Sequence, residues 1–470
     1  MSRINIPHTL AEILSIPKLR QSYLVGGCVR DAVMGIEPKD FDVEVFGIEY
    51  DELAQILDNW GRVDIVGKSF GVIKLTKDGE TYDFNLPRID SKVAEGHRGF
   101  KVRVDHGLTL RQAAARRDFT INALAYDPHT NEVIDNFGGL FDIEHKILRH
   151  IGPSFSDDPL RVMRGMQFCG RFGLKVDWDT VLLCRDLLCK FDEIAAERLW
   201  MEWYKWAAMS ERPSDGLWFL EETKWIEKFP LLGFMVGCEQ DPEWHPEGDV
   251  MTHTWFCCDS LVETDNWFCR SKDERAVLMM AVLLHDCGKY LTTERVMRDG
   301  VERIVSPNHD LIGGTLASSF LKKMVAPELF RQKVKALVSC HMAHLSPPSK
   351  RTVRRLAERL HPATIDQLMM VVQADHAGRP PLPKDMPANA LEIQRLAKEL
   401  NVESSAPKPL ILGRHLIELG LQPGPDFKRY LTALFEMQLD GQFETLQDGI
   451  LMAKLKIRDE LRYGPSEVTE

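Results

Sequence analysis

The period of the apolar residues changes near residue 150, and this change limits the fold of the chain more than any other feature. Before it, short β-branched runs alternate with glycine turns and two helix-like stretches, which is typical of an α/β domain. From about residue 155 almost to the end, apolar residues recur at helical spacing, as at Leu160, Met163 and Met166. The sequence therefore predicts an α+β chain in which a small α/β head is followed by a long all-α region.

Two proline-bearing breaks subdivide the helical region. They cover residues 238–248 and 378–387, where CEQDPEWHPEG and GRPPLPKDMP interrupt the helical pattern. A chain of 470 residues has room for about three domains. We expect the head at residues 1–150, a helical neck at 151–238, a second helical domain at 239–385 and a C-terminal helical region at 386–470.

Composition and charge exclude several classes of protein. The sequence has no run of about 18 apolar residues, and its start lacks a basic segment followed by a long apolar one, so neither a transmembrane helix nor an export signal is expected. The ten cysteines include no CxxC pair, which favours reduced thiols in a cytosol. The net charge of −11 does not indicate a nucleic-acid partner, which would need local basic patches. We therefore expect a cytoplasmic protein without a membrane partner.

A glycine pair marks the first candidate site. In YLVGGCVRDAVMG, an apolar strand pattern turns at Gly26 and Gly27 and continues as a short helix that stops at Gly35. Such a turn directs backbone N–H groups at an anion, and Arg30 lies one helical turn further on to add charge. A tight strand-to-helix turn needs glycine in any case, so phosphate binding and a purely structural turn both remain open.

Carboxylates follow two neighbouring strand patterns. In KDFDVEVFG, Asp40 and Asp42 alternate with apolar residues, and Asp83 does so in YDFNL. On strands these carboxylates share the face opposite the core, where they repel one another. A divalent cation removes that repulsion, so the three aspartates suit two Mg²⁺ ions and phosphoryl transfer. The alternative is a solvated acidic face.

Four motifs in order carry a resemblance to a known family. GGCVRD, DFD, RRDFTINALAYD and DDPLRVMR together resemble the bacterial tRNA nucleotidyltransferases. That family contains the CCA-adding enzymes, their CC- and A-adding relatives and bacterial poly(A) polymerase. The resemblance implies that Arg116, Arg117 and Asp118 belong to the nucleotide site, with Asn122 nearby. The alternative for this group is a surface charge cluster.

The last motif offers a way to read a base. Asp158 and Arg161 are three residues apart in an expected helix and would share one face. A carboxylate only accepts and a guanidinium only donates, which fits the amino group and ring nitrogen of cytosine and adenine but not uracil or guanine. Alternatively, Asp158 caps the helix that Pro159 begins. Asp157, where the family usually has Glu, could take over that capping role.

Two basic stretches are candidates for RNA contact. Residues 159–176 contain four basic residues, Arg164 among them, and no acidic one, so contact with RNA phosphates is expected there. Residues 350–359 contain a second basic run, which we interpret as a solvated face.

A second constellation lies in the region 239–385. His253, His285-Asp286 and Asp375 fall in this order on helical segments and resemble the HD-type metal phosphohydrolase module of some bacterial tRNA nucleotidyltransferases. Imidazoles and carboxylates can hold a divalent ion, of a kind the sequence leaves open, that activates water. The module could also be a degenerate scaffold. A second ion would need further ligands, for which the candidates are His309, His341 and His344.

The resemblance thus implies template-independent addition of C and A, from CTP and ATP, to the 3′ end of tRNA. Asp40 and Asp42, with Asp83, would hold two Mg²⁺ ions. Gly26, Gly27, Arg30 and Arg117 would hold the triphosphate. The open alternatives are a CC-only or A-only enzyme, a poly(A) polymerase, an HD-type phosphodiesterase with an RNA-holding front domain, and a non-catalytic RNA-binding protein. The oligomeric state is not predicted.

Overall fold

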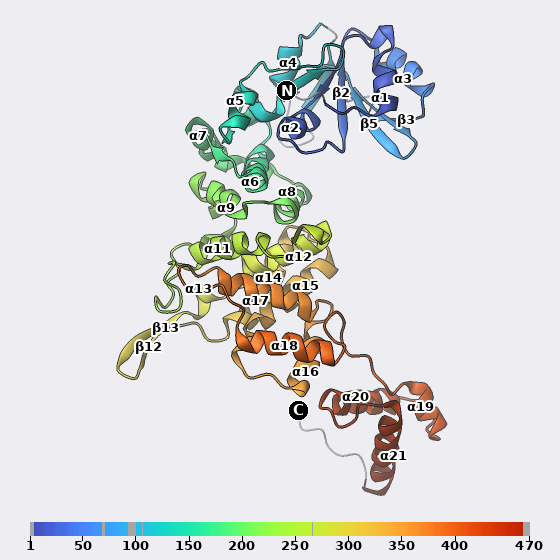
Figure 1. Cartoon of the computed structure of the whole chain (residues 1–470), viewed down its shortest axis with the longest axis vertical. Helices are drawn as coiled ribbons and strands as arrows, with labels where there is room; N and C mark the ends of the chain where they lie inside the picture. Colours follow the sequence, from blue (N-terminus) through green and yellow to red (C-terminus); the bar gives the residue numbers. More distant parts are fainter. Residues whose placement is uncertain (1–3, 68–70, 93–99, 106, 266, 464–470) are drawn as a thin grey trace. The chain divides into compact units, whose positions relative to one another are not determined.

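The computed structural model describes residues 4–67, 71–92, 100–105, 107–265 and 267–463. The chain divides into two compact units, Met1–Pro230 and Leu231–Glu470 (Figure 1). The first unit contains an α/β head followed by helices, and the second consists mainly of helices. The expected α+β class is therefore confirmed. The finer boundaries expected near residues 150, 238 and 385 stay predictions.

A seven-stranded sheet forms the centre of the head. Its strands follow the order β3-β4-β5-β2-β1-β8-β9. β2 and β5 are parallel, and the other neighbouring strands are antiparallel. A separate hairpin is made by β6 (Arg88–Lys92) and β7 (Phe100–Val104). The strands of the main sheet are β1 Ser22–Val25, β2 Phe41–Val45, β3 Arg62–Gly67, β4 Val72–Lys77, β5 Glu80–Asn85, β8 Ala125–Asp127 and β9 Glu132–Ile134.

The core of the head follows from the alternation that the sequence shows. Phe41, Val43 and Val45 of β2 are all buried and belong to one apolar cluster with residues of the neighbouring strands. The helices α1 (His8–Leu14) and α3 (Tyr50–Asp58) contribute leucines to the same cluster. This packing leaves the other face of β2 for polar side chains, as a strand of period two requires.

Behind the head, the first unit is completed by helices. The longer ones are α6 (Leu160–Phe172), α7 (Trp178–Asp186), α8 (Ala196–Met209) and α9 (Pro213–Glu222). α6 contacts both α8 and α9. Small residues permit this approach, because a Cβ on Gly165 would lie 2.6 Å from the ring of Phe219 and one on Gly170 would lie 2.7 Å from Trp206. The shorter helices of the head are α2 Gly27–Val33, α4 Leu110–Ala114, η3 Thr120–Asn122 and α5 Gly139–Glu144. The shorter helices that follow the head are η4 Pro153–Asp157, η5 Leu187–Glu193 and η6 Trp225–Lys228.

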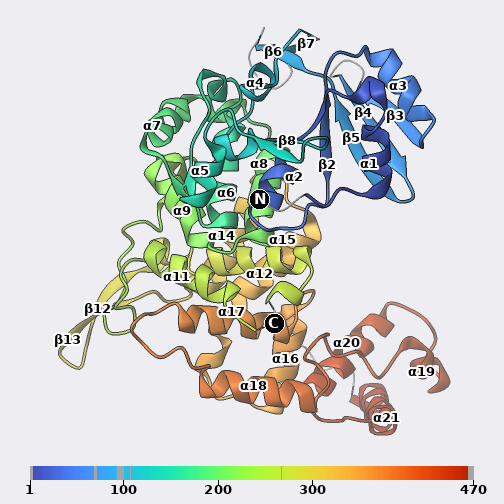
Figure 2. The same ribbon diagram turned by 45° about the horizontal axis from the view of Figure 1, so that its top comes forward.

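The second unit is organised around α12, Lys272–Leu284. Its run from Ala276 to Leu284 is buried on all sides, which explains why the sequence there lacks a polar stripe. α12 contacts α11, α15 and α17 (Figure 2). The surrounding helices are α11 Val250–Val262, α13 Lys289–Thr292, α14 His309–Lys323, α15 Glu328–Cys340, η8 His341–Leu345, α16 Lys350–Leu360, α17 Ile365–Ala377 and α18 Ala388–Glu399.

Two segments depart from the expected all-α region. The shorter is β11 (Lys175–Val176), which pairs in parallel with β10 (Ile147–Leu148), and the longer is a hairpin. Residues 294–305 form an antiparallel hairpin of β12 (Glu294–Arg298) and β13 (Val301–Val305). The turn consists of Asp299 and Gly300, which both have positive φ values of 52° and 79°. An Asp-Gly pair between two strands is a strong hairpin signal, because both residues tolerate the left-handed backbone that such a turn requires. The expectation of helix throughout was wrong at this point.

The basic run at residues 350–359 is not a simple solvated face. Arg351 and Arg355 of α16 each pair with Asp440, and Arg354 pairs with Glu444. These acidic partners belong to the C-terminal region, whose helices are α19 Gly413–Glu418, α20 Asp426–Leu439 and α21 Leu446–Tyr463. The arginines therefore join α16 to that region.

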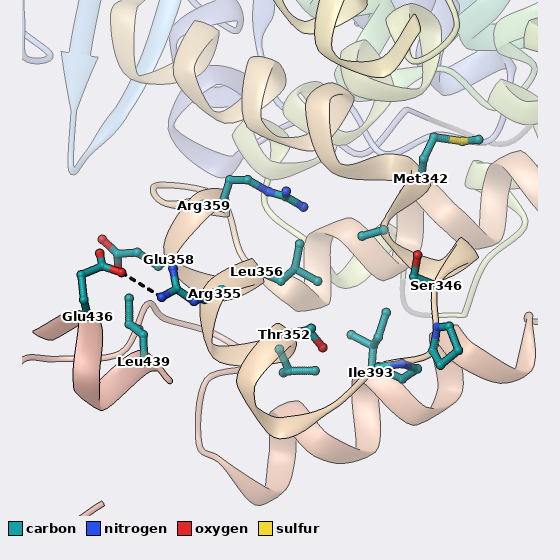
Figure 3. Close-up of a pocket in the computed structure, with 14 residues that line it drawn as sticks. Met342, Ser346, Thr352, Arg355, Leu356, Glu358, Arg359, Ile393, Glu436 and Leu439 are labelled. Carbon is teal, nitrogen blue, oxygen red and sulfur yellow. Dashed lines mark hydrogen bonds and ion pairs between the residues drawn. The ribbon is translucent and has the colours of Figure 1, made fainter. Parts of the chain in front are cut away.

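A cavity of about 600 Å³ lies beside these ion pairs. Figure 3 shows Arg355 and Glu436 as an ion pair on its wall, near Arg359 and Ile393. Its lining contains none of the residues for which the sequence predicts chemistry.

Candidate active site and candidate metal centre

Two of the three expected aspartates lie opposite each other in the sheet. The parallel pairing of β2 and β5 places Asp42 beside Asp83, and Asp40 precedes β2 with its side chain exposed. Burial raises the pKa of the Asp42 carboxyl, Arg117 lowers it, and the charges of Asp83 and Asp40 raise it again. Negative charge is therefore concentrated at this point of the sheet. Such a set of carboxylate oxygens suits a hard divalent cation.

Glu44 has a role that sequence reasoning missed. It lies on the same strand as Asp42 but is fully buried, because Arg116 and Arg117 cover it at 3.3 and 3.6 Å from its carboxylate oxygens. A buried carboxylate needs such partners to remain charged. Glu44 thus holds both guanidinium groups next to the aspartates. The available signal in the sequence was that Glu44 is the third acidic residue of DFDVE, after Asp40 and Asp42.

The glycine turn brings the arginines and aspartates together. Gly26 has φ +76°, and a Cβ there would lie 2.6 Å from Nη1 of Arg117 and 3.9 Å from Oδ2 of Asp42. Only a residue without a side chain fits both the backbone and this approach. Gly27 begins α2, which has only seven residues. The positive group that approaches Gly26 is therefore Arg117, whereas Nη2 of Arg30 lies 3.6 Å from a Cβ built on Gly27.

Arg30 lies beside the turn, as the sequence suggests, but other side chains engage its guanidinium. Its guanidinium donates to Oδ1 of Asn122 at 2.6 Å and to the carboxylate of Asp31, and it lies over the rings of Phe168 and Phe172. It is also buried. Arg30 thus helps to fix the position of α2 against η3 and α6, and its contact with a triphosphate stays a prediction.

A buried polar network connects the third motif to the fourth. Asn122 donates to Oδ1 of Asp118 at 2.9 Å, and Nε of Arg164 donates to Oδ2 at 2.6 Å. Burial alone would raise the pKa of Asp118, but the charge of Arg164 and these hydrogen bonds lower it to about 2. The alternative of a surface charge cluster does not describe Asp118 and Asn122, which are both buried. Arg164 is partly exposed.

The two base-reading candidates do not share a helix face. Asp158 precedes α6 with an extended backbone (φ −128°, ψ 102°), so the expected i, i+3 arrangement on one helix was wrong. Arg161 in the first turn donates to the backbone carbonyls of Ser154 at 2.7 Å and Arg116 at 2.6 Å. The guanidinium next to Asp158 belongs instead to Arg198 of α8, at 2.6 Å. Their roles toward a base stay predictions.

Asp158 also caps the following helix in part, which is the alternative role that the sequence offers for it. Its Oδ1 accepts the backbone N–H of Leu160 at 3.1 Å, while Oδ2 accepts from Arg198. The carboxylate therefore both caps the start of α6 and faces a second helix. Arg198, the residue that sequence reasoning missed, lies in the segment ERLWMEW at residues 197–203, where nothing local indicates its partner.

The second constellation is assembled in the second unit. His253 comes from α11, His285 and Asp286 directly follow α12, and Asp375 comes from α17. Nε2 of His253 lies 3.2 Å from Oδ1 of Asp375, and Nε2 of His285 lies 3.3 Å from Oδ2 of Asp286. Cys257, one helical turn after His253, joins His253, His285 and Asp375 in a group whose ligand atoms lie within 4.8 Å of one another. The structure thus brings the four residues of the expected constellation close together, and their role as metal ligands stays a prediction.

Hydrogen bonds orient the imidazoles toward the centre of this cluster. Nδ1 of His285 lies 2.7 Å from the carbonyl oxygen of Val282, and Nδ1 of His253 lies 2.7 Å from Oε1 of Glu247. These oxygens accept, so each Nδ1 carries the hydrogen and each Nε2 is left to bind a cation. Glu247 in the proline-rich loop was not expected from the sequence.

Lys289 is a further member that the sequence analysis missed. Its Nζ lies 2.6 Å from Oδ2 of Asp286 and 2.7 Å from the side-chain oxygen of Gln240. Burial opposes the charge of Asp286, but the charges of His285 and Lys289 hold the pKa of this carboxyl well below its usual range. Asp286 is therefore a carboxylate available to a metal. The signal was the spacing HDCGK, which puts the lysine one turn beyond the aspartate.

No helix among the described residues has the length and apolar character needed to cross a membrane.

Comparisons with known proteins agree with the head and with the helical architecture. Residues 22–149 match the family described as the poly A polymerase head domain. A multifunctional CCA protein of Xylella fastidiosa (strain 9a5c) is 32% identical over 373 residues, which cover 76% of this chain and 84% of the relative.

Solved structures show the same fold at low sequence identity. The CCA-adding enzyme of Bacillus stearothermophilus in complex with CTP has a TM-score of 0.61 and 19% identity, covering 97% of this chain and 100% of its own. The CCA-adding enzyme of Thermotoga maritima complexed with tRNA has a TM-score of 0.56 and 18% identity, covering 97% of both chains.

Proposed function

Because the chain belongs to the bacterial tRNA nucleotidyltransferase family, we propose that it adds C and A from CTP and ATP to the 3′ end of tRNA. The observation that carries this proposal is the placement of Asp42 opposite Asp83, beside the Gly26 turn and the Arg117 guanidinium. This arrangement combines oxygen ligands for a divalent metal with a positive group for phosphates. RNA binding alone would not need the aspartates.

Asp40, Asp42 and Asp83 would hold the divalent metal on which the family depends, and we propose Mg²⁺ because the ligands are all hard oxygen atoms. Mg²⁺ bound there would lower the pKa of the tRNA 3′-hydroxyl and stabilise charge on the leaving pyrophosphate. Arg117, held by Glu44, would contact the triphosphate next to the glycine turn. Asp42 is partly buried, and this favours the contact between Arg117 and the triphosphate, because charges attract more strongly in a partly buried site than in open water.

Selection of the base is proposed for Asp158 and Arg161. The carboxylate of Asp158 can accept the amino group of cytosine or adenine, and a guanidinium can donate to the adjacent ring nitrogen. Arg161 would have to exchange the carbonyls of Ser154 and Arg116 for the base. Arg198 holds the carboxylate of Asp158 in place through two hydrogen bonds, and is therefore proposed as a positioning residue.

The test compares incorporation of labelled CTP and ATP into tRNA lacking its 3′ end by the wild type and by Asp42→Asn. We expect a loss on the order of 10³-fold or more in rate with an unchanged melting temperature, because a large electrostatic contribution is removed without loss of packing. Asp78→Asn is the matched control, since Asp78 is an exposed residue of the β4–β5 turn. Near-normal incorporation by Asp42→Asn would reject the proposed site.

A second activity is proposed for the cluster in the second unit: metal-dependent hydrolysis of a phosphoester. The observation that favours it is the convergence of His253, His285, Asp286 and Asp375, with inward-facing Nε2 atoms. A metal bound there would activate water for attack on phosphorus. Lys289 lies next to Asp286, so its ammonium group would also bind the phosphate of the substrate. The degenerate-scaffold alternative predicts no bound metal.

This activity is tested with 2′,3′-cyclic nucleotides and small phosphoesters in Mg²⁺, Mn²⁺ and Ni²⁺; the choice of cyclic phosphates comes from the family resemblance. His285→Ala should abolish the hydrolysis and lower the metal content of the purified chain. No activity with any of the three ions, together with no bound metal, would support the degenerate scaffold.

A further inference from the structure

Glu44 lies on the polar face of β2 but is closed off from solvent. Its side chain is fully buried, and its registered neighbours in the sheet are Tyr23 of β1 and Asn85 of β5. A phenol and an amide cannot neutralise a carboxylate, and a buried carboxylate remains charged only when cations lie close to it. Arg116 and Arg117, from the segment before η3, supply that charge.

The two oxygens of Glu44 engage the two arginines differently. Nη2 of Arg116 donates a hydrogen bond to Oε1 at 3.3 Å. Nη2 of Arg117 lies 3.6 Å from Oε2, which is too far for a hydrogen bond, and this buried oxygen has no hydrogen-bond partner among the described residues. Glu44 therefore attracts Arg117 by charge and leaves the N–H donors of its guanidinium available.

Arg117 is held beside the glycine turn at which the triphosphate is proposed to bind. A Cβ built on Gly26 would lie 2.6 Å from Nη1 of Arg117. The Arg117 side chain also remains 18% exposed, so a ligand can reach it. Its donors can therefore form paired hydrogen bonds with phosphate oxygens, for which the planar guanidinium is well suited.

The backbone of Arg116 links Glu44 to the arginine proposed to read the base. While its guanidinium is bound to Glu44, its carbonyl oxygen accepts a hydrogen bond of 2.6 Å from Nη2 of Arg161. Arg161 must leave this carbonyl to reach a base, so the position of the Arg116 backbone decides how readily it does so. A change at Glu44 can therefore affect both the triphosphate and the base.

We propose that Glu44 is a positioning residue for nucleotide transfer. It places Arg117 for the triphosphate and, through the backbone of Arg116, it places Arg161 for the base. This inference rests on the nucleotide transfer proposed above. Glu44 is not a metal ligand in it, because its two oxygens face the two arginines and its side chain is fully buried. One carboxylate thus couples affinity for the phosphates to the choice of base.

The test measures CTP binding to the full chain by isothermal titration calorimetry, and incorporation of CTP and UTP into tRNA lacking its 3′ end. We expect Glu44→Gln to raise the dissociation constant for CTP about tenfold, because Arg117 loses the charge that holds it. The preference for CTP over UTP should fall about threefold, because the backbone that holds Arg161 is no longer fixed. The Mg²⁺ concentration that gives half the maximal rate should not change.

Glu44→Asp keeps the charge but withdraws it by one methylene, so it should fall between the wild type and Glu44→Gln in affinity and in base preference. This variant also keeps the test decisive if Glu44→Gln does not fold. Glu52→Gln is the matched control, because Glu52 forms an exposed ion pair with Lys18 elsewhere in the head and should leave both values unchanged.

Two results would overturn the inference while the proposed function stands. One is wild-type affinity and base preference in both Glu44 variants, with only a lower melting temperature, which would make Glu44 a structural residue. The other is a raised Mg²⁺ requirement in Glu44→Gln, which would make it a metal ligand. Failure of the wild type to incorporate CTP would overturn the proposed nucleotide transfer and this inference with it.

Discussion

The carboxylate of Asp158 accepts two hydrogen bonds from the guanidinium of Arg198, at 2.6 and 3.3 Å, although 40 residues separate them in the sequence. Both side chains are partly exposed, so the pair is accessible to a ligand. The contact fixes a carboxylate that directly precedes α6. It links the residue proposed to read a base with a helix that has no expected catalytic residue.

Replacement of Arg198 should therefore impair nucleotide selection. In Arg198→Ala, Asp158 loses its charged partner, and we expect the KM for ATP and CTP to rise about tenfold, since a hydrogen bond to a charged group contributes about 1–3 kcal/mol. Incorporation of UTP and GTP should increase relative to ATP. Arg198→Lys, which keeps the charge but not the paired geometry, should be intermediate. Unchanged nucleotide selection with a lower melting temperature would mean that the pair is only structural.

Replacement of Gly26 should impair nucleotide binding in a different way. In Gly26→Ala the new Cβ meets Nη1 of Arg117, so this guanidinium should move and the KM for both nucleotides should rise. The left-handed backbone also costs about 1–2 kcal/mol of stability. Gly79→Ala is the matched control, because Gly79 has φ +86° with nothing within 4 Å of the built Cβ. It should lose stability but keep its nucleotide affinity; equal KM values in both variants would contradict the role of Arg117.

Asp118 predicts a stability change in acid. Its pKa is about 2 in the folded chain, below the ordinary value of 3.8. A lowered pKa stabilises the folded state above the unfolded value, and this contribution of about 2 kcal/mol is lost as the pH falls from about 4 to 2. Denaturant unfolding of the wild type and Asp118→Asn should therefore differ most above pH 4 and converge toward pH 2. A difference that stays constant with pH would show that Asp118 titrates normally.

The two proposed activities should respond independently to mutation. The residues of the first activity lie in the unit Met1–Pro230, and those of the second lie in the unit Leu231–Glu470. His285→Ala combined with Asp286→Ala should abolish phosphoester hydrolysis and leave nucleotide incorporation within a few-fold of the wild type. Loss of incorporation in this double variant would instead show that the second unit supports tRNA binding through its fold.

Local patterns predicted the parts of the fold that depend on neighbouring residues. The alternation in DFDVEV gave the buried and polar faces of β2, and the order of His253, His285-Asp286 and Asp375 gave the residues that converge in the second unit. These features depend on periods of two and about 3.6 residues, which are visible in any short window of sequence. The same approach missed the β12–β13 hairpin because the surrounding helical pattern outweighed the Asp299-Gly300 turn.

Partners that are distant in the sequence were not predictable in this way. The burial of Glu44 depends on arginines some 70 residues later, and the partner of Asp158 lies in another helix. The exact start of α6 decided whether Asp158 and Arg161 share a face, and the helix begins at Leu160, two residues after the aspartate. Helix ends and long-range ion pairs depend on tertiary packing, which propensities do not contain.

The product formed on a tRNA that lacks its last three nucleotides tests the central claim most directly. The purified chain would be incubated with CTP, ATP and Mg²⁺, singly and together, and the extended 3′ ends would be sized and sequenced. We predict two C residues with CTP alone and C, C and A with both nucleotides, after which extension stops. Addition of C alone, of A alone or of a long A tail when both nucleotides are present would contradict the account.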